Sequence, residues 1–215
     1  MRAAGILLPL SSLPGPFGIG TLGKEARHFV DFLQAAGQSR WQILPIGPTG
    51  YGDSPYQSFS AFAANPYFID PALLEADGLL APGEADAFAW GEDESRVDYG
   101  ALYRGRHALL KRAVDRLDPE DEGLAAFCEQ NAFWLEDYAF FMALKGENGQ
   151  KSWLDWPDPV RLREPSALRR AAERLAGQVR YWKGVQYLFH RQWTALKAYA
   201  NEKGVAIIGD IPIHV

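Results

Sequence analysis

The stretch 41-WQILPI-46 is a short apolar run that reads as a buried β-strand. A similar run, 5-GILLPL-10, precedes it. Between the two, 24-KEARHFVDFLQAAG-37 carries apolar residues at helical spacing, and its last residue, Gly37, is typical of the position just beyond a helix end. A strand, a helix and a second strand, with both strands apolar throughout, predict a βαβ unit in a parallel sheet.

Downstream of this unit, from about residue 71 to 204, helical patterns dominate the chain. The clearest predicted helices are 101–117, 123–146 and 180–204. The stretch 151–165 holds three prolines and predicts a loop. The chain then ends with 205-VAIIGDIPIHV-215, a third apolar run that predicts another buried strand.

The order of these elements predicts an α/β fold in three parts. Residues 1–70 form two strands and a long loop, 71–204 a helical insertion, and 205–215 a third strand. An open sheet of three parallel strands leaves an edge without a partner and one face thinly covered. We therefore expect the sequence to be part of a longer one.

Composition indicates a soluble intracellular protein. The 215 residues are 47% hydrophobic and 23% charged, and the net charge of −5 disfavours a nucleic-acid partner. The single cysteine, Cys128, cannot form an internal disulfide, so a cytoplasmic location is expected. No apolar run approaches the roughly 20 residues of a membrane span, and no membrane partner is expected.

One motif points to a dinucleotide cofactor, but its context does not fit. Gly18, Gly20 and Gly23 have the G-x-G-x-x-G spacing before a predicted helix. In a dinucleotide fold the motif follows the strand directly, whereas here 11-SSLPGPF-17 intervenes, and the second strand lacks the acidic residue that binds ribose. The expectation is therefore a tight loop and no cofactor.

The segment that follows the second strand, 50-GYGDSPYQSFSAFAANPYFID-70, has neither helical nor strand periodicity. It mixes aromatic rings with small hydroxyl and amide side chains. A pyranose offers an apolar C–H face to a ring and hydroxyl groups to short polar side chains, so a sugar is one ligand that suits this composition. The alternative is that the rings form a satellite core beneath the helical insertion while the hydroxyls cap turns.

A resemblance favours the sugar. The strings 11-SSLPGPFGIGTLG-23, 41-WQILPIGPTGYGDSPYQSFSAFAANPYFID-70 and 209-GDIPIHV-215 resemble the 4-α-glucanotransferases called amylomaltase or disproportionating enzyme, glycoside hydrolase family 77. The resemblance implies the first three strands of a (β/α)8 barrel that transfers α-1,4-glucan segments between maltooligosaccharides. It implies a retaining double displacement on two carboxylates, with no metal and no cofactor.

The resemblance also implies that this chain holds no catalytic residue. The family's three catalytic carboxylates belong to later barrel strands, and a complete barrel typically takes roughly 250 residues even without insertions. We therefore expect the 215 residues alone to be inactive. The alternative function is a free-standing, non-catalytic glucan-binding module.

The family's substrate residues carry over onto this sequence by motif. Tyr56 matches a tyrosine that stacks on the glucose at the cleavage point, and Asp210 matches an aspartate that hydrogen-bonds that sugar, although a strand-end aspartate also caps turns. The other residues that the resemblance assigns to the substrate loop are Ser54, Gln57, Ser58 and Asn65, each of which has a turn-holding role as its alternative. Tyr51 and Tyr99 resemble aromatics of a second, remote glucan groove, and Tyr99 has a plain helix-start role as its alternative.

Overall fold

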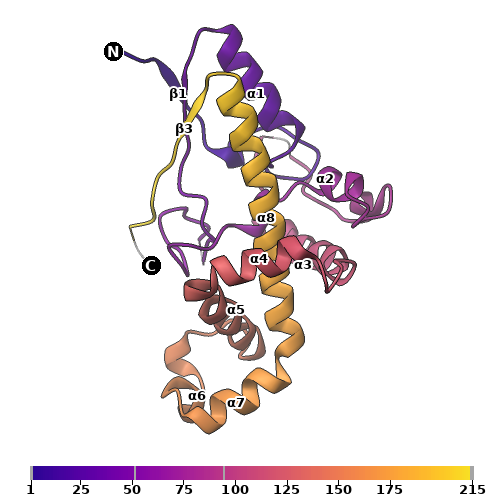
Figure 1. Ribbon diagram of the computed structural model, residues 1–215, viewed down its shortest axis with the longest axis vertical. Coiled ribbons are helices and arrows are strands. Elements are labelled where there is room, and N and C mark those ends of the chain that lie inside the picture. The colour runs from indigo at the N-terminus through magenta and orange to yellow at the C-terminus, as the bar shows by residue number, and fades with distance from the viewer. Residues whose placement is uncertain (1, 51, 94, 214–215) are drawn as a thin grey trace. The chain divides into compact units, whose positions relative to one another are not determined.

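The computed structural model of the protein describes residues 2–50, 52–93 and 95–213 (Figure 1). Its contacts divide the chain into two compact units. The sheet unit comprises Met1–Leu117 and Leu188–Val215, and the helical unit comprises Asp118–Tyr187. These boundaries lie at other positions than those of the three predicted segments, because residues 71–117 and 188–204 belong to the same unit as the strands. The division into 1–70, 71–204 and 205–215 stays a prediction.

Three parallel strands form the sheet, in the order β1-β2-β3. They are β1 (Gly5–Leu7), β2 (Arg40–Gln42) and β3 (Ala206–Ile208). The registers pair Ile6 with Trp41 and Trp41 with Ile207. The predicted parallel α/β arrangement is therefore confirmed, with each strand shorter than its apolar run.

The prediction that all the strands are buried throughout was wrong. Trp41 of the central strand is fully buried, and the ring of Phe29 packs against it at 5.0 Å between centroids. Leu7 and Ile208, however, expose 54% and 43% of their surface. In the described sheet, β1 and β3 each have one neighbouring strand, and so only the central strand is enclosed on both sides.

Helix α1 (Lys24–Ala35) confirms the βαβ prediction. It buries Ala26, Val30 and Leu33, which the helical spacing places on one face. The helix ends as predicted at Gly37, whose φ of 68° lies in the left-handed region, and Gln38 N donates to Leu33 O at 2.8 Å.

The remaining elements of the sheet unit are short except for two helices. They are η1 (Leu10–Ser12), η2 (Pro66–Phe68), α2 (Pro71–Ala76), η3 (Glu84–Ala87), α3 (Tyr99–Asp115) and the second part of α8 (Ala176–Glu202). Arg106 of α3 is fully buried and ties two loops to this helix. Its guanidinium donates to Phe17 O at 2.8 Å and to Ile69 O at 3.1 Å.

The helical unit contains α4 (Glu122–Gln130), α5 (Ala132–Glu147), η4 (Trp153–Asp155), α6 (Asp158–Arg161), α7 (Pro165–Arg174) and the first part of α8. The prediction of one helix over 123–146 was wrong, because the helix is interrupted at Asn131. The Asn131 amide donates to Phe127 O at 2.8 Å, and Trp134 Nε1 donates to Asn131 Oδ1 at 3.0 Å. The Asn131 side chain therefore satisfies a carbonyl group near the end of α4 and an indole N–H near the start of α5.

The stretch 151–165, predicted as a loop, instead includes the short helices η4 and α6. Its prolines lie where helices accept them, at or just before the first helical turn. The buried Trp156 lies between the two and packs against Phe141 at 5.5 Å between ring centroids. Across the described residues of both units, no helix combines the length and the apolar character needed to cross a membrane.

Candidate functional site

The aromatic segment after β2 is a closed loop. Asn65 N donates to Ile46 O at 2.8 Å, which returns the chain to the end of the strand run. Within the loop, Thr49 and Ser58 form an isolated antiparallel bridge. Ser58 is buried, and its Oγ lies 2.9 Å from the carbonyl oxygens of Pro48 and Ser60. The contacts of Ser58 are thus those of a residue that holds the loop.

Of the other polar residues of the loop, two hold turns with their side chains and one is exposed to solvent. Ser54 Oγ accepts from Tyr56 N at 3.3 Å, and Asn65 Oδ1 accepts from Tyr67 N at 2.9 Å, so both side chains hold turns. Gln57 is exposed, and its N–H donates to Ser54 O at 3.2 Å. These contacts fix the loop and leave the Gln57 amide facing solvent.

Tyr56 and Asp210 meet although 154 positions separate them. Tyr56 Oη donates to Asp210 Oδ2 at 2.9 Å. Ile213 N donates to Tyr56 O at 3.2 Å, which joins the segment after β3 to the loop after β2. Asp210 Oδ1 accepts from its neighbour Ile211 N at 2.8 Å. The family resemblance assigned both residues to the substrate site, and the structure brings them together beyond the carboxyl ends of adjacent parallel strands.

Charge and exposure at this pair suit the binding of a neutral ligand. The hydrogen bond to the Asp210 carboxylate raises the pKa of Tyr56, which keeps the phenol protonated and able to donate. The hydrogen bond lies at the exposed surface. A half-buried ring beside an exposed carboxylate offers an apolar face and strong hydrogen-bond acceptors to one solute.

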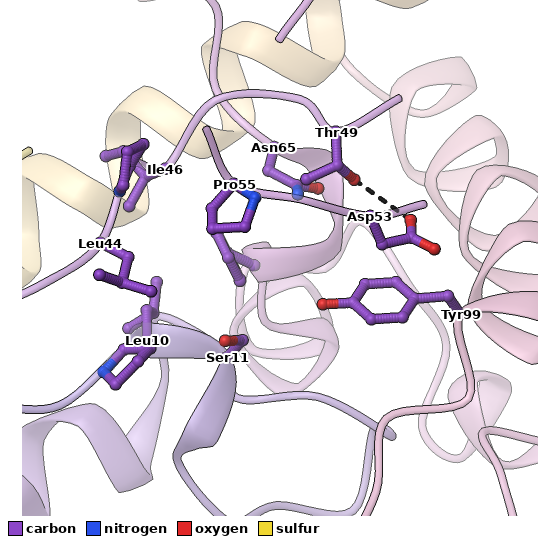
Figure 2. Close-up of a pocket in the computed structure, with 12 residues that line it drawn as sticks. Leu10, Ser11, Leu44, Ile46, Thr49, Asp53, Pro55, Asn65 and Tyr99 are labelled. Atoms are coloured by element: carbon purple, nitrogen blue, oxygen red, sulfur yellow. Dashed lines mark hydrogen bonds between the residues drawn. The ribbon is translucent and has the colours of Figure 1, made fainter. Parts of the chain in front are cut away.

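A small cavity of about 40 Å³ lies beside this loop (Figure 2). Its walls come from the segments that follow β1 and β2, from the loop, and from the start of α3. The polar residues on its lining are Ser11, Thr49, Asp53, Asn65 and Tyr99, and the rest of the lining is apolar. Binding sites of α/β sheets lie at the carboxyl ends of their strands, as this cavity does.

Tyr99, one of the two residues assigned to a second groove, lines the cavity. It is the first residue of α3, and burial raises its pKa. Its ring lies 6.4 Å from that of Tyr67, whose pKa burial raises to about 12. Tyr51, the other assigned residue, lies outside the described residues. A second groove formed by these two tyrosines stays a prediction.

Sequence reasoning missed Asp53. This residue has a φ of 54°, in the left-handed region where side-chain-bearing residues are uncommon, and its N–H donates to Gly50 O at 3.2 Å. Thr49 Oγ1 donates to Asp53 Oδ1 at 3.4 Å, and burial raises the pKa of the Asp53 carboxyl. The available signal was an aspartate inside a Gly-Asp-Ser-Pro turn, since aspartate tolerates this backbone conformation.

The glycine loop is filled by the protein itself. A Cβ atom at Gly18, Gly20 or Gly23 would collide with Trp90 O, Leu10 O or the Asp70 carboxylate, respectively. The G-x-G-x-x-G spacing therefore serves close packing of backbone against neighbouring segments. Among the residues that the structure describes, no cluster of three or more His, Cys, Asp or Glu side chains has the arrangement of a metal site.

The parallel strands and the crossover helix define part of an α/β fold that carries an aromatic–carboxylate pair at its strand ends. The chain belongs to the 4-alpha-glucanotransferase family, glycoside hydrolase family 77, whose model matches residues 8–215. It is 52% identical over 219 residues to the 4-alpha-glucanotransferase of Thermus thermophilus, covering 100% of this chain and 43% of that protein. It is 45% identical over 207 residues to the enzyme of Clostridium butyricum, covering 96% of this chain and 42% of that protein.

Structural comparison agrees. The amylomaltase from Streptococcus agalactiae, solved in complex with acarbose, matches with a TM-score of 0.95 and 42% identity. The match covers 99% of this chain and 44% of that one. The chain thus spans less than half the length of the relatives it matches, and its three strands correspond to the N-terminal part of the barrel fold.

Proposed function

We propose that the protein containing this chain is a 4-α-glucanotransferase. It transfers α-1,4-glucan segments between maltooligosaccharides by a retaining double displacement, and this chain contributes part of the substrate-binding wall. The catalytic carboxylates would come from outside the 215 residues. Family membership and the contact between Tyr56 and Asp210 support this proposal.

The contact between Tyr56 and Asp210 carries the argument. Glycosyl transfer with retention requires a sugar held against two carboxylates with its ring distorted towards an oxocarbenium ion. Tyr56 supplies a face for the C–H side of that ring, and Asp210 supplies acceptors for its hydroxyl groups. Asn65, Ser54 and Ser58 keep the loop in place, while Gln57 adds an exposed amide.

The test is disproportionation of maltotriose by the complete gene product, followed by chromatography of glucose and longer maltodextrins. Tyr56→Ala removes the stacking face and should slow transfer at least in proportion to the ~0.5–1.5 kcal/mol of one aromatic contact, and by more if the contact tightens in the transition state. Tyr56→Phe keeps the face and removes the hydrogen bond to Asp210, so its loss should be smaller. Tyr103→Phe, at a tyrosine of α3 with 55% exposure, is the matched control and should transfer at the normal rate. Unchanged transfer by Tyr56→Ala would refute the assigned role.

A non-catalytic glucan-binding module is the second candidate. The chain's substrate residues are assembled within it, and this observation favours the module. The 215-residue chain, expressed alone, should then bind maltooligosaccharides and unfold cooperatively. Absence of both properties would leave only the transferase. For either function we propose a cytoplasmic location, which agrees with the single cysteine at position 128.

A further inference from the structure

The helical unit contains a cavity of about 560 Å³. Its lining residues come from α4, α5, α7 and the first part of α8 (Figure 1), so the cavity lies wholly inside this unit. Cavities of roughly 300–1,000 Å³ are the size that takes a small-molecule ligand. All the residues that the sequence assigned to glucan binding belong to the other unit. This cavity is therefore a candidate site of its own.

The wall of the cavity is mainly aliphatic. Phe140 and Val179 line it and also pack against the buried core of the helical unit, so the unit's own packing holds this part of the wall in place. Burial raises the pKa of the Cys128 thiol, which therefore stays neutral near pH 7 and acts as a small apolar group. The other apolar lining residues are Leu124, Ala172 and Ala176. A wall with one aromatic ring suits an alkyl chain better than a sugar, which binds against ring faces.

Charged side chains lie beside this apolar wall. Lys183 Nζ donates to Glu136 Oε1 at 2.5 Å, and Asp137 Oδ1 lies 3.5 Å from the Arg163 guanidinium. Both carboxylates of the lining thus have a cationic partner, and Arg180 is a further cation on the same lining. An ammonium group carries three N–H donors, and the contact with Glu136 uses one of those on Lys183. The polar part of the cavity therefore suits an anionic head group that accepts hydrogen bonds.

We propose that this cavity binds a medium-chain fatty carboxylate, whose alkyl chain contacts the apolar wall and whose carboxylate accepts hydrogen bonds from Lys183. The inference goes beyond the proposed transferase, because it concerns a different class of ligand and a different unit of the chain. Each CH₂ group that leaves water for the apolar wall should tighten binding roughly fourfold. The alkyl chain then supplies most of the affinity, and the head group fixes its orientation.

A calorimetric titration of the complete gene product with three ligands tests both halves of the proposal. Decanoate should bind with one-to-one stoichiometry. Octanoate has the same head group and two fewer CH₂ groups, so it should bind about tenfold less tightly. Decyltrimethylammonium has the same chain and the opposite charge, and it should bind more weakly than decanoate. No binding of decanoate, or tighter binding of the cation, overturns the proposal.

Variants of the ion pair separate the ammonium group from general effects on charge. Lys183→Met keeps an apolar stem and removes the donor, so decanoate should bind about fivefold less tightly or worse. Glu136→Gln breaks the same ion pair but leaves the ammonium group, and should tighten binding. Equal losses in the two variants overturn the role of Lys183. The matched control is Lys111→Met, at a lysine of α3 that pairs with Asp115 at 2.6 Å, and it should bind decanoate normally.

A second pair of variants tests the space itself. Ala172 is an exposed lining residue, so Ala172→Phe should fill part of the cavity and abolish decanoate binding without disturbing the core. Ala125→Phe, at an exposed position of α4 outside the lining, is the control and should bind normally. Thermal unfolding of both variants checks that they remain folded. Normal binding by Ala172→Phe places the ligand elsewhere and overturns the proposal.

The thiol of Cys128 reports where the ligand lies. Labelling by N-ethylmaleimide, followed by mass spectrometry of the peptide that contains Cys128, should slow about tenfold at a decanoate concentration ten times its dissociation constant. An unchanged labelling rate in the presence of bound decanoate overturns the assigned position. Vesicles of phosphatidylglycerol offer the same chemistry at a membrane surface. Sedimentation with the vesicles in the absence of decanoate binding would replace the free carboxylate by a lipid surface, and so overturn the proposal.

Discussion

Replacing Gln192 by leucine should destabilise the sheet unit by about 1–3 kcal/mol. This glutamine lies on α8 and is 6% exposed. Its Oε1 accepts from Asp70 N at 2.7 Å, and its Nε2 donates to Asp70 O at 3.1 Å, so one side chain contacts both backbone polar groups of residue 70. Asp70 ends the aromatic segment, and its carboxylate accepts from Thr21 in the glycine loop.

The magnitude follows from these two contacts. Leucine has a similar size but no polar atoms, so it leaves the buried Asp70 N–H without a partner, at about 1–3 kcal/mol. Asp70 O keeps one long hydrogen bond, from Leu74 N at 3.4 Å. Removing the glutamine's own buried amide offsets part of that cost. The expected loss in the free energy of unfolding is therefore about 1–3 kcal/mol.

Urea unfolding of the complete gene product, followed by tryptophan fluorescence, measures this loss. The matched control is Gln178→Leu, an exposed position on the same helix, where a surface substitution should change stability by about 0.5 kcal/mol or less. Equal stability of Gln192→Leu and Gln178→Leu would refute the reasoning, because it would show that the Asp70 peptide groups find other partners without cost.

Three further predictions concern particular residues. Burial lowers the pKa of His107 from 6.5 to about 4, so as the pH falls the unfolded chain binds this proton first, and stability decreases between about pH 6.5 and 4. His107→Gln should remove up to about 3 kcal/mol of that decrease. Thermal unfolding at pH 7 and pH 4.5 measures it. Gly23→Ala should lower the melting temperature because its Cβ meets the Asp70 carboxylate. Gly177→Ala, in open space on a helix, should leave the melting temperature unchanged or raise it, because alanine adds up to about 1 kcal/mol of stability in a helix. Asn131→Ala removes two side-chain hydrogen bonds between α4 and α5 and should cost about 1–2 kcal/mol in urea unfolding.

Residue spacing predicted the first helix and the parallel pairing of the first two strands, because both depend on residues close together in the sequence. Helix α1 follows from apolar spacing and from Gly37, and the parallel order follows from a short helix between two apolar runs. The break at Asn131 was missed because apolar residues continue across it. It depends on one amide that reaches back to Phe127 and on an indole that reaches Asn131 from the next helix. A periodicity average does not register either contact.

The family resemblance assigned the two central residues of the candidate site, and the strand pattern explains why they meet. Tyr56 and Asp210 follow adjacent parallel strands, and the carboxyl ends of such strands meet at one edge of the sheet. Ser58 is different, because its hydroxyl packs inside the loop, a contact that depends on the bridge to Thr49. Sequence composition identifies polar residues of a loop but does not separate those that hold it from those that face a ligand.

Asp53 and the glycine loop show the same ambiguity from two sides. A glycine spacing states that something approaches the backbone closely, and here the approaching groups are Trp90 O, Leu10 O and Asp70, all from this chain. An aspartate in the left-handed region is held at a conformational cost, and here Asp53 lines the small cavity beside the loop. Both signals are local, whereas the identity of the neighbour is a property of the fold. For this reason, the glycine spacing that suggested a cofactor reflects packing against this chain's own atoms, and Asp53, which no sequence motif singled out, lines a pocket.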